Sequence, residues 1–126
     1  MVIVFGFTLV PRTITSAEFE SANQSVREVA AAVARAGGYP HVEAAFLELG
    51  EPDLAGAVAR LAGQGVRRIV VVPYFLTLGT HLERDLPRLV DEIALKYKDL
   101  AIYSTLPLEG HPGLVQVLLD RIATIK

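Results

Sequence analysis

The chain has 126 residues, a formal net charge of −2 and no cysteine, and 52% of its residues are hydrophobic. This length suits one domain with a substantial core, and so high an apolar content excludes a disordered chain. The lack of cysteine excludes disulfides, thiolate metal sites and a cysteine nucleophile. The near-neutral balance argues against a nucleic-acid partner, which needs clustered basic residues. We therefore expect a single domain over residues 1–126.

No apolar run has the length of a membrane span, because Pro11, Pro73 and Gly79 interrupt the candidates. The first residues carry no basic segment of the kind that opens a secretory signal, and they begin directly with a strand-like run. We therefore expect a cytoplasmic protein with no membrane partner.

The first predicted unit is a strand followed by a helix. Residues 2–7 form a short apolar run that is typical of a buried strand. Thr15 and Glu18 then have the spacing of a capping box, which marks the beginning of a helix. Apolar residues at helical spacing follow, and this helix is expected to end at Gly37, because glycine tolerates a left-handed cap.

The same alternation continues along the chain. Strands are predicted at residues 42–49, 68–75 and 100–104, where apolar residues dominate short segments. A helix with apolar residues at helical spacing is predicted over residues 54–62, and a last helix is expected to begin at Pro112.

The third strand leads into the most informative junction of the chain. The apolar run ends at Leu78-Gly79-Thr80, and helical spacing begins between Leu82 and Pro87. Pro87 is expected in the first turn of this helix, where its missing amide costs little. His81 is therefore predicted in the loop between a buried strand and a helix.

The order of strands and helices predicts an α/β fold. Strands that alternate with helices form a parallel sheet through right-handed crossovers, which place helices on both faces. We expect a compact three-layer sandwich around a four-stranded parallel sheet. In such a sheet, ligands bind outside the carboxyl ends of the strands.

Polar residues follow each of the four predicted strands, so they lie at one edge of the sheet. They are Thr8 and Arg12 after the first strand, Glu48 and Glu51 after the second, Thr80, His81 and Arg84 after the third, and Thr105, Glu109 and His111 after the fourth. These side chains are expected to line one cleft.

His81 is the candidate for metal or proton chemistry, since neutral imidazole binds divalent metals and titrates near neutral pH. The alternative is a helix-start residue that bonds its own turn. Glu48 and Glu51 are candidates for a base and a metal ligand, but a carboxylate at position 51 also stabilises a helix start. Arg84 and Arg88, one turn apart, form either a solvated helix face or an anchor for ligand carboxylates.

The other two histidines predict no chemistry. His111 precedes Pro112 and is expected to be structural or exposed at a helix start. His41 lies on the opposite edge of the sheet and is expected to be solvated. The chain also lacks a glycine-rich nucleotide loop and a nucleophile elbow, which argues against nucleotide binding and acyl-enzyme hydrolysis.

Three segments of the chain, in order, resemble the small sirohydrochlorin cobaltochelatases, which are class II tetrapyrrole chelatases. The similar segments are Phe46–Pro52, Gln64–Pro73 and Gly79–Pro87, with a further family-like segment at Gly110–Leu114. The resemblance implies one half of a two-lobed chelatase, a homodimer, and a metal bound by histidines from two loops. His81 matches the second of these histidines, and Glu48 or Glu51 matches an acidic position near the cleft.

One position departs from the family pattern. Members of this family end their first strand with Gly-His-Gly-Ser, and that histidine is the other metal ligand. The corresponding residues here are Phe5-Gly6-Phe7-Thr8, so Gly6 stands in place of the histidine. Glycine has no side chain to bind a metal or take a proton. Phe5 and Phe7 either fill part of the space for the macrocycle or give it an apolar surface.

The resemblance implies insertion of a divalent metal ion into sirohydrochlorin, as in cobalamin biosynthesis, so the protein would be a lyase. Cobalt is the expected metal, with nickel or iron as alternatives, and it is a substrate, since no organic cofactor is expected. His81 would present the metal or accept a pyrrole proton, and Glu48 or Glu51 would carry a proton away. The residues expected to bind the tetrapyrrole are Phe7, Thr8, Arg12, Thr80 and Arg84.

The glycine at position 6 leaves three functions open. One is a chelatase with weak or absent turnover, because a second metal ligand is missing. The second is a non-catalytic protein that binds the tetrapyrrole or the metal. The third is a subunit that pairs with a complete chelatase half and supplies His81 alone.

Overall fold

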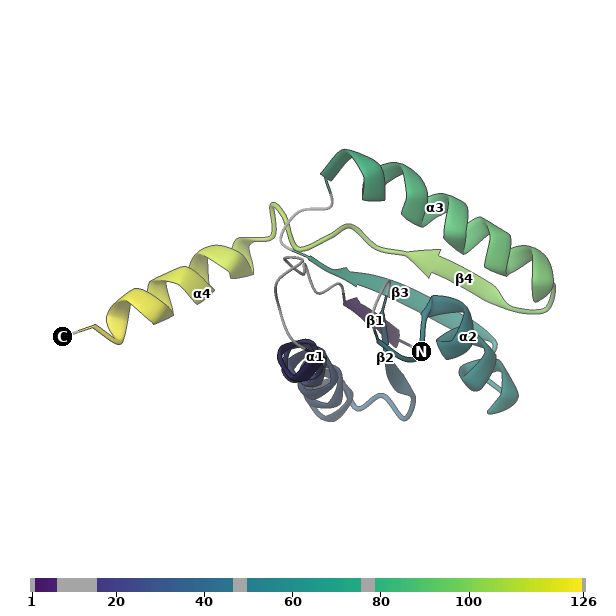
Figure 1. Cartoon of the computed structure of the whole chain (residues 1–126), viewed down its shortest axis with the longest axis horizontal. Coiled ribbons are helices and arrows are strands. Elements are labelled where there is room, and N and C mark those ends of the chain that lie inside the picture. The colour runs from purple at the N-terminus through teal and green to yellow at the C-terminus, as the bar shows by residue number, and fades with distance from the viewer. Residues whose placement is uncertain (1, 7–15, 47–49, 76–78, 126) are drawn as a thin grey trace.

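The computed structural model describes residues 2–6, 16–46, 50–75 and 79–125. Strands and helices alternate in these ranges (Figure 1), so the predicted α/β class and element order are confirmed. The elements are β1 (Val2–Gly6), α1 (Ser16–Gly37), β2 (Val42–Phe46), α2 (Leu54–Gly63), β3 (Arg68–Tyr74), α3 (Gly79–Lys96), β4 (Ala101–Ser104) and α4 (Pro112–Ala123).

The strands form a parallel sheet of order β2-β1-β3-β4. β1 is therefore central, with β2 on one side and β3 on the other. Its last residue, Gly6, is in register with Phe46 of β2 and Tyr74 of β3. This register places the end of β1 at the carboxyl edge of the sheet, between two neighbouring strand ends.

One face of the sheet carries the larger part of the core. Burial alternates along β3, where Ile69 and Val71 are fully buried and Val70 and Val72 are half-buried. The buried side chains of β3 contact α2 and α3, which both cover this face. The cluster consists of Ala45, Leu54, Ala57, Val58, Leu61, Val66, Ile69, Val71, Phe75, Leu86, Val90 and Ile93.

α1 covers part of the opposite face. Val26 and Ala30 of this helix pack against Ala44 and Phe46 of β2, with Tyr74 of β3 at the margin of the cluster. α1 and α3 thus lie on opposite sides of the sheet (Figure 1). Helices on both faces make the three layers that the sequence predicts.

α4 does not join these layers. It projects away from the sheet, with the C-terminus at its far end (Figure 1), and none of its side chains is buried. The amide of Thr105 donates to the carbonyl of Val71, and the amide of Leu108 donates to the carbonyl of Phe75. These bonds hold the segment after β4 alongside β3. The prediction of a fully compact sandwich is therefore wrong for α4.

α3 begins earlier than the sequence predicts. The helix begins at Gly79, so His81 lies in its first turn and not in a preceding loop. Pro87 lies inside the helix, about two turns from its start, and the prediction that it falls in the first turn is wrong. Helical spacing alone missed this start because Gly79 and Thr80 are weak helix formers. Among the described helices, none is both long and apolar enough to span a membrane.

Candidate functional site

The backbone brings two positions, Gly6 and His81, to one edge of the sheet. These are the positions that correspond to the two metal-binding histidines of the chelatases that the sequence resembles. Gly6 ends β1 and is in register with Tyr74, the last residue of the adjacent strand β3. α3 follows β3 and begins at Gly79, so its first turn belongs to the neighbouring strand-to-helix junction. Thr80 and His81 are the second and third residues of that turn. A side chain at position 6 and His81 therefore come from adjacent strand ends.

The free amides of the first turn of α3 make this junction suitable for anions. The first amides of any helix lack helical acceptors, and the macrodipole makes this end partly positive. Arg84 is exposed one turn further on, and its Nε lies 3.9 Å from Oδ1 of Asp85. An exposed ion pair of this length is weak, so the guanidinium stays able to bind another carboxylate.

Four of the predicted site residues, Phe7, Thr8, Arg12 and Glu48, lie outside the described residues. Their predicted roles remain predictions, as does the role of the His81 side chain.

Two hollows flank the segment that follows β4. The larger, of about 650 Å³, is lined by Val72 and by residues 105–112, and most of its lining is apolar. The smaller, of about 370 Å³, lies between this segment and Glu83, Leu86 and Pro87 of α3. Both share residues 105–107, so the segment after β4 separates one hollow from the other.

The larger hollow gathers the polar residues predicted after the fourth strand, which are Thr105, Glu109 and His111. His111 caps α4, because its Nδ1 accepts a hydrogen bond of 2.9 Å from the amide of Gly113. In the neutral ring the proton then lies on Nε2, so His111 has no free lone pair for a metal ion. The prediction of a structural, exposed His111 is confirmed.

Glu51 lines a hollow of about 260 Å³ along the outer edge of β2. None of the α3 side chains that the structure describes, which begin at Glu83, is in that lining. β2 is the edge strand, two positions from β3 in the sheet. The structure therefore assigns Glu51 to the hollow beside β2, and its catalytic role stays a prediction.

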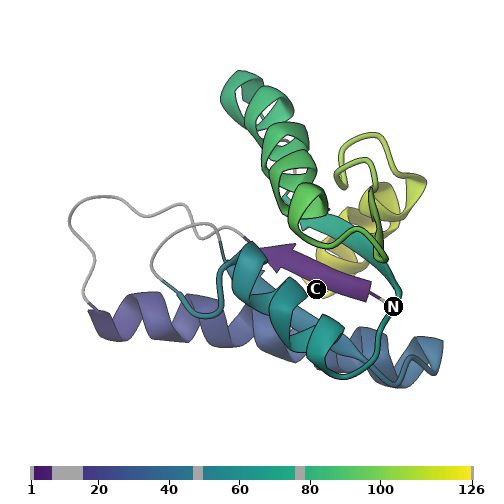
Figure 2. The same cartoon turned by 90° about the vertical axis from the view of Figure 1, so that its right-hand side faces the viewer.

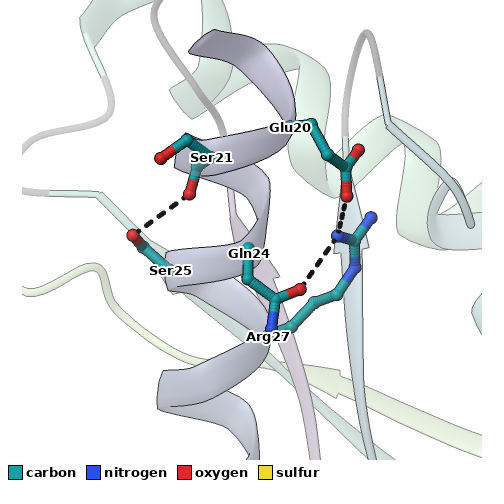
Figure 3. Close-up of polar contacts among 5 residues, drawn as sticks. All are labelled: Glu20, Ser21, Gln24, Ser25 and Arg27. Carbon is teal, nitrogen blue, oxygen red and sulfur yellow. Dashed lines mark hydrogen bonds and ion pairs between the residues drawn. The ribbon is translucent and has the colours of Figure 1, made fainter. Parts of the chain in front are cut away.

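Both arginines that line the hollow beside β2 have acidic neighbours. Arg27 lies 2.6 Å from Glu20 and 3.4 Å from Gln24 (Figure 3), and its guanidinium stacks 5.2 Å from the centre of the Phe46 ring. Arg60 lies 3.8 Å from Glu43. Because both guanidinium groups have acidic neighbours, this hollow is a poor anchor for an acidic ligand.

His41 differs from its prediction. Its Nδ1 lies 2.9 Å from Oε1 of Gln64, and the ring is half-buried, so it is hydrogen-bonded and not simply solvated. The bond joins the start of β2 to the end of α2, which are 23 residues apart. Such long-range pairs carry no signal in local spacing.

The apolar residues Leu106, Pro107 and Leu108 are the part of the lining that sequence reasoning missed. Their signal was a short apolar run after the fourth strand without helical spacing. Among the side chains that the structure describes, no group of three or more His, Asp or Glu residues could hold a metal ion.

Comparison with known sequences gives several matches. The sequence profile of the CbiX family matches residues 17–125. A chloroplastic sirohydrochlorin ferrochelatase of Arabidopsis thaliana is 40% identical over 85 residues, which cover 68% of this chain and 38% of the relative. The sirohydrochlorin cobaltochelatase of Saccharolobus islandicus is 38% identical over 87 residues, which cover 64% of this chain and 68% of the relative. That of Methanopyrus kandleri is 32% identical over 119 residues, which cover 79% of this chain and 83% of the relative.

Solved structures match almost the whole chain. A CbiX protein of Marinobacter aquaeolei superposes with a TM-score of 0.78 and 25% identity, covering 98% of this chain and 93% of that one. SirB from Bacillus subtilis with Fe3+ gives a TM-score of 0.79 and 23% identity, and covers 98% of this chain and 46% of SirB. At that identity the match to SirB shows the fold alone.

The parallel sheet, with a strand-to-helix junction that carries a histidine, and these matches assign the chain to a family of class II chelatases. The family match covers most of the chain, and the chain belongs to the CbiX family. It spans 38% of the length of the Arabidopsis relative and about half of SirB.

Proposed function

We propose that the protein is a sirohydrochlorin chelatase that inserts a divalent metal ion into the tetrapyrrole, with cobalt as the preferred metal. The observation that carries this proposal is the meeting of β1 and the first turn of α3 at one edge of the sheet. Histidine at one of these positions, His81, is retained, and Gly6 occupies the other. The relatives act as cobalto- and ferrochelatases by name, which supports the reaction class.

His81 presents the metal or accepts a pyrrole proton. Insertion needs a metal held weakly enough to be released and the loss of two protons from the pyrrole nitrogens. Neutral imidazole suits cobalt, nickel and iron alike. Glu48 and Glu51 are proposed to carry protons away, although the position of Glu51 beside β2 favours Glu48 for this role.

The proposed substrate is a tetrapyrrole with carboxylate groups around its edge, and the start of α3 suits such a ligand. The free amides of the first turn, together with Arg84, favour carboxylates. Thr80 in that turn, and Phe7, Thr8 and Arg12 after β1, are proposed to hold the rest of the macrocycle.

Gly6 predicts low turnover. A divalent ion held by one imidazole is bound less tightly and in a less defined geometry than one held by two. We therefore propose slower insertion than in a relative with histidine at both positions. The same observation favours a second candidate, a non-catalytic protein that binds the tetrapyrrole or the metal.

The protein is proposed to act in the cytoplasm as a homodimer. A single sheet offers one wall to the flat macrocycle, whereas a second copy provides the opposite wall. This arrangement would correspond to the two lobes of the longer relatives, of which the chain spans about half in the case of SirB.

The decisive experiment compares the wild type with Gly6→His and His81→Ala. Purified protein is mixed with sirohydrochlorin and Co2+, and insertion is followed by the absorbance of the metallated product. We expect slow insertion by the wild type, an increase of about tenfold or more in Gly6→His, and a loss in His81→Ala to the rate without protein. His41→Ala is the matched control, because His41 is bonded to Gln64 and belongs to neither junction.

Titration of sirohydrochlorin without metal separates the two candidates. Binding with no metallated product, in the wild type and in Gly6→His alike, would favour the non-catalytic protein. Insertion that is unchanged in His81→Ala would contradict the proposed site.

A further inference from the structure

Basic residues gather at the edge of the sheet where the strands begin. This amino edge consists of the first residues of the strands and of the connections that lead into them, residues 38–41, 64–67 and 97–100. Figure 2 shows the start of β1 and the ends of α1 and α2 on the same side of the molecule, at the right of the view. Of the 12 lysine and arginine residues of the chain, five lie in these connections or within three residues of them: Arg35, Arg67, Arg68, Lys96 and Lys98.

The positive charges of the amino edge are not neutralised by neighbouring carboxylates. All five basic side chains are exposed, and none forms an ion pair with a carboxylate that the structure describes. The same stretches of sequence contain two acidic residues, Glu43 and Asp99. Glu43 lies 3.8 Å from Arg60, which is not one of the five. The amino edge therefore has a positive potential, which attracts anions.

A hollow of about 340 Å³ lies at the amino edge, between the start of β2 and the start of β3. Gly65 keeps this hollow open, because its φ of +85° favours glycine and a Cβ there would meet nothing within 4 Å. The amides of Gly65 and Val66 donate to carbonyls in the last turn of α2, which makes this helix end less negative toward an anion. The lining consists of His41, Gln64, Gly65, Val66, Arg67 and Arg68.

Arg68 is held in place without losing its charge. Its guanidinium carbon lies 5.3 Å from the centre of the Tyr103 ring. Stacking on an aromatic ring orients the guanidinium plane and leaves the N–H groups along its edge able to bind an anion. Arg67 precedes Arg68, and successive side chains of a strand point to opposite faces of the sheet. Since both arginines line the hollow, their guanidinium groups approach it from different sides.

Gln64 adds an uncharged donor to the hollow. Its Oε1 lies 2.9 Å from Nδ1 of His41, so the amide group is tied to the start of β2. Its Nε2 makes no hydrogen bond with a residue that the structure describes, and stays able to donate. Donors that reach one hollow from several directions suit the tetrahedral oxygens of a phosphate group better than the two coplanar oxygens of a carboxylate.

We propose that the hollow at the amino edge binds a phosphate group, as inorganic phosphate or as a phosphate ester. Arg67 and Arg68 bind its charged oxygens, Gln64 donates to a further oxygen, and His41 positions Gln64. β3 runs from Arg68 to Tyr74, so this hollow and the start of α3 lie at opposite ends of the same strand. The site goes beyond metal insertion and holds whether or not the protein is a chelatase.

Titration of the wild type with inorganic phosphate tests the site directly. The amide resonances of Gly65 and Val66 are followed by NMR at low ionic strength, where exposed charges are least screened. We expect saturable shifts with a Kd of about 1 mM, and no such shifts with sodium chloride at matched ionic strength. Methyl phosphate and succinate are titrated in parallel. Tighter binding of methyl phosphate supports a phosphate ester as the ligand, whereas binding of succinate as tight as that of phosphate contradicts the phosphate assignment.

Charge-removing variants give a second measurement. We expect Arg67→Gln and Arg68→Gln each to weaken phosphate binding by about tenfold, because each removes charge-assisted hydrogen bonds. Arg121→Gln, an exposed position on α4, removes the same charge far along the chain and should change the Kd by less than about twofold. All three side chains are exposed, so the variants should keep their fold, which circular dichroism checks.

The proposal is overturned if the wild type shows no saturable shifts at about ten times the expected Kd, or if Arg121→Gln weakens binding as much as the other two variants. Neither measurement involves the tetrapyrrole or a metal ion, so failure of the chelatase proposal would be seen separately.

Discussion

Gly50 lies beside the buried side chains of Asn23 in α1 and Phe46 in β2. A Cβ at this position would lie 2.7 Å from Nδ2 of Asn23 and 2.7 Å from Cγ of Phe46. Asn23 is 1% exposed and Phe46 is equally buried, so neither side chain has free space to move into. The close approach, and not a special backbone angle, requires glycine here.

We expect Gly50→Ala to lower the free energy of unfolding by about 1–3 kcal/mol, because overpacking displaces buried neighbours. Gly63→Ala is the control: a Cβ at Gly63 meets nothing within 4 Å, and alanine should stabilise the end of α2 by up to about 1 kcal/mol. Urea unfolding of both variants makes the comparison. Equal stability of the two would contradict the steric argument.

His81 could be predicted from sequence as a candidate site residue because its signal is local. A buried apolar run, a glycine and a helical spacing occur within a few residues of one another. Glu51 was a weaker inference, since the position of a strand end says nothing about which side of the sheet a side chain lines. Only the fold shows that Glu51 lines the hollow beside β2.

α3 contains a proline that the sequence pattern placed at the helix start. Pro87 lies inside the helix, where it cannot donate to the carbonyl of Glu83 one turn earlier. The ring is exposed and lines the smaller hollow beside the segment after β4. The helix tolerates it because Leu86, Val90 and Ile93 pack into the core.

Pro87→Ala should therefore stabilise the protein, because the new amide can donate within α3. We expect a gain of about 1–2 kcal/mol, which is the interior cost of proline less the entropy that proline removes from the unfolded chain. Arg88→Ala, at the next exposed position, is the control and should change stability by less than about 0.5 kcal/mol. Thermal unfolding measures both. A loss of stability in Pro87→Ala would show that the ring itself makes a contact that the fold needs.

In the molecule as a whole, α4 is the helix that does not pack into the core of its own chain. Full burial of an exposed aliphatic side chain contributes about 1.5–3 kcal/mol, so the apolar side of α4 offers several kcal/mol to any surface that covers it. If a second copy provides that surface, folding and association are linked.

Linkage predicts that the melting temperature rises with protein concentration. For a dimer of this size, a tenfold rise in concentration should increase the melting temperature by about 2–4 °C. Calorimetry of the wild type at two concentrations tests this, with Leu118→Asp/Ile122→Asp as the variant whose melting temperature should stay constant. A wild-type melting temperature that does not depend on concentration would argue against a linked dimer.

The sequence by itself determined the order of strands and helices and the parallel α/β class. These properties depend on the spacing of apolar residues within short segments, which local patterns report directly. Even the amphipathic character of α4 follows from its own residues.

Only the tertiary structure decided where the apolar side of α4 points and that His41 bonds Gln64. The physical reason is that spacing shows which side of an element is apolar but not which surface covers it. That choice depends on contacts between residues far apart in the chain, such as the bonds of Thr105 and Leu108 to β3 and its extension.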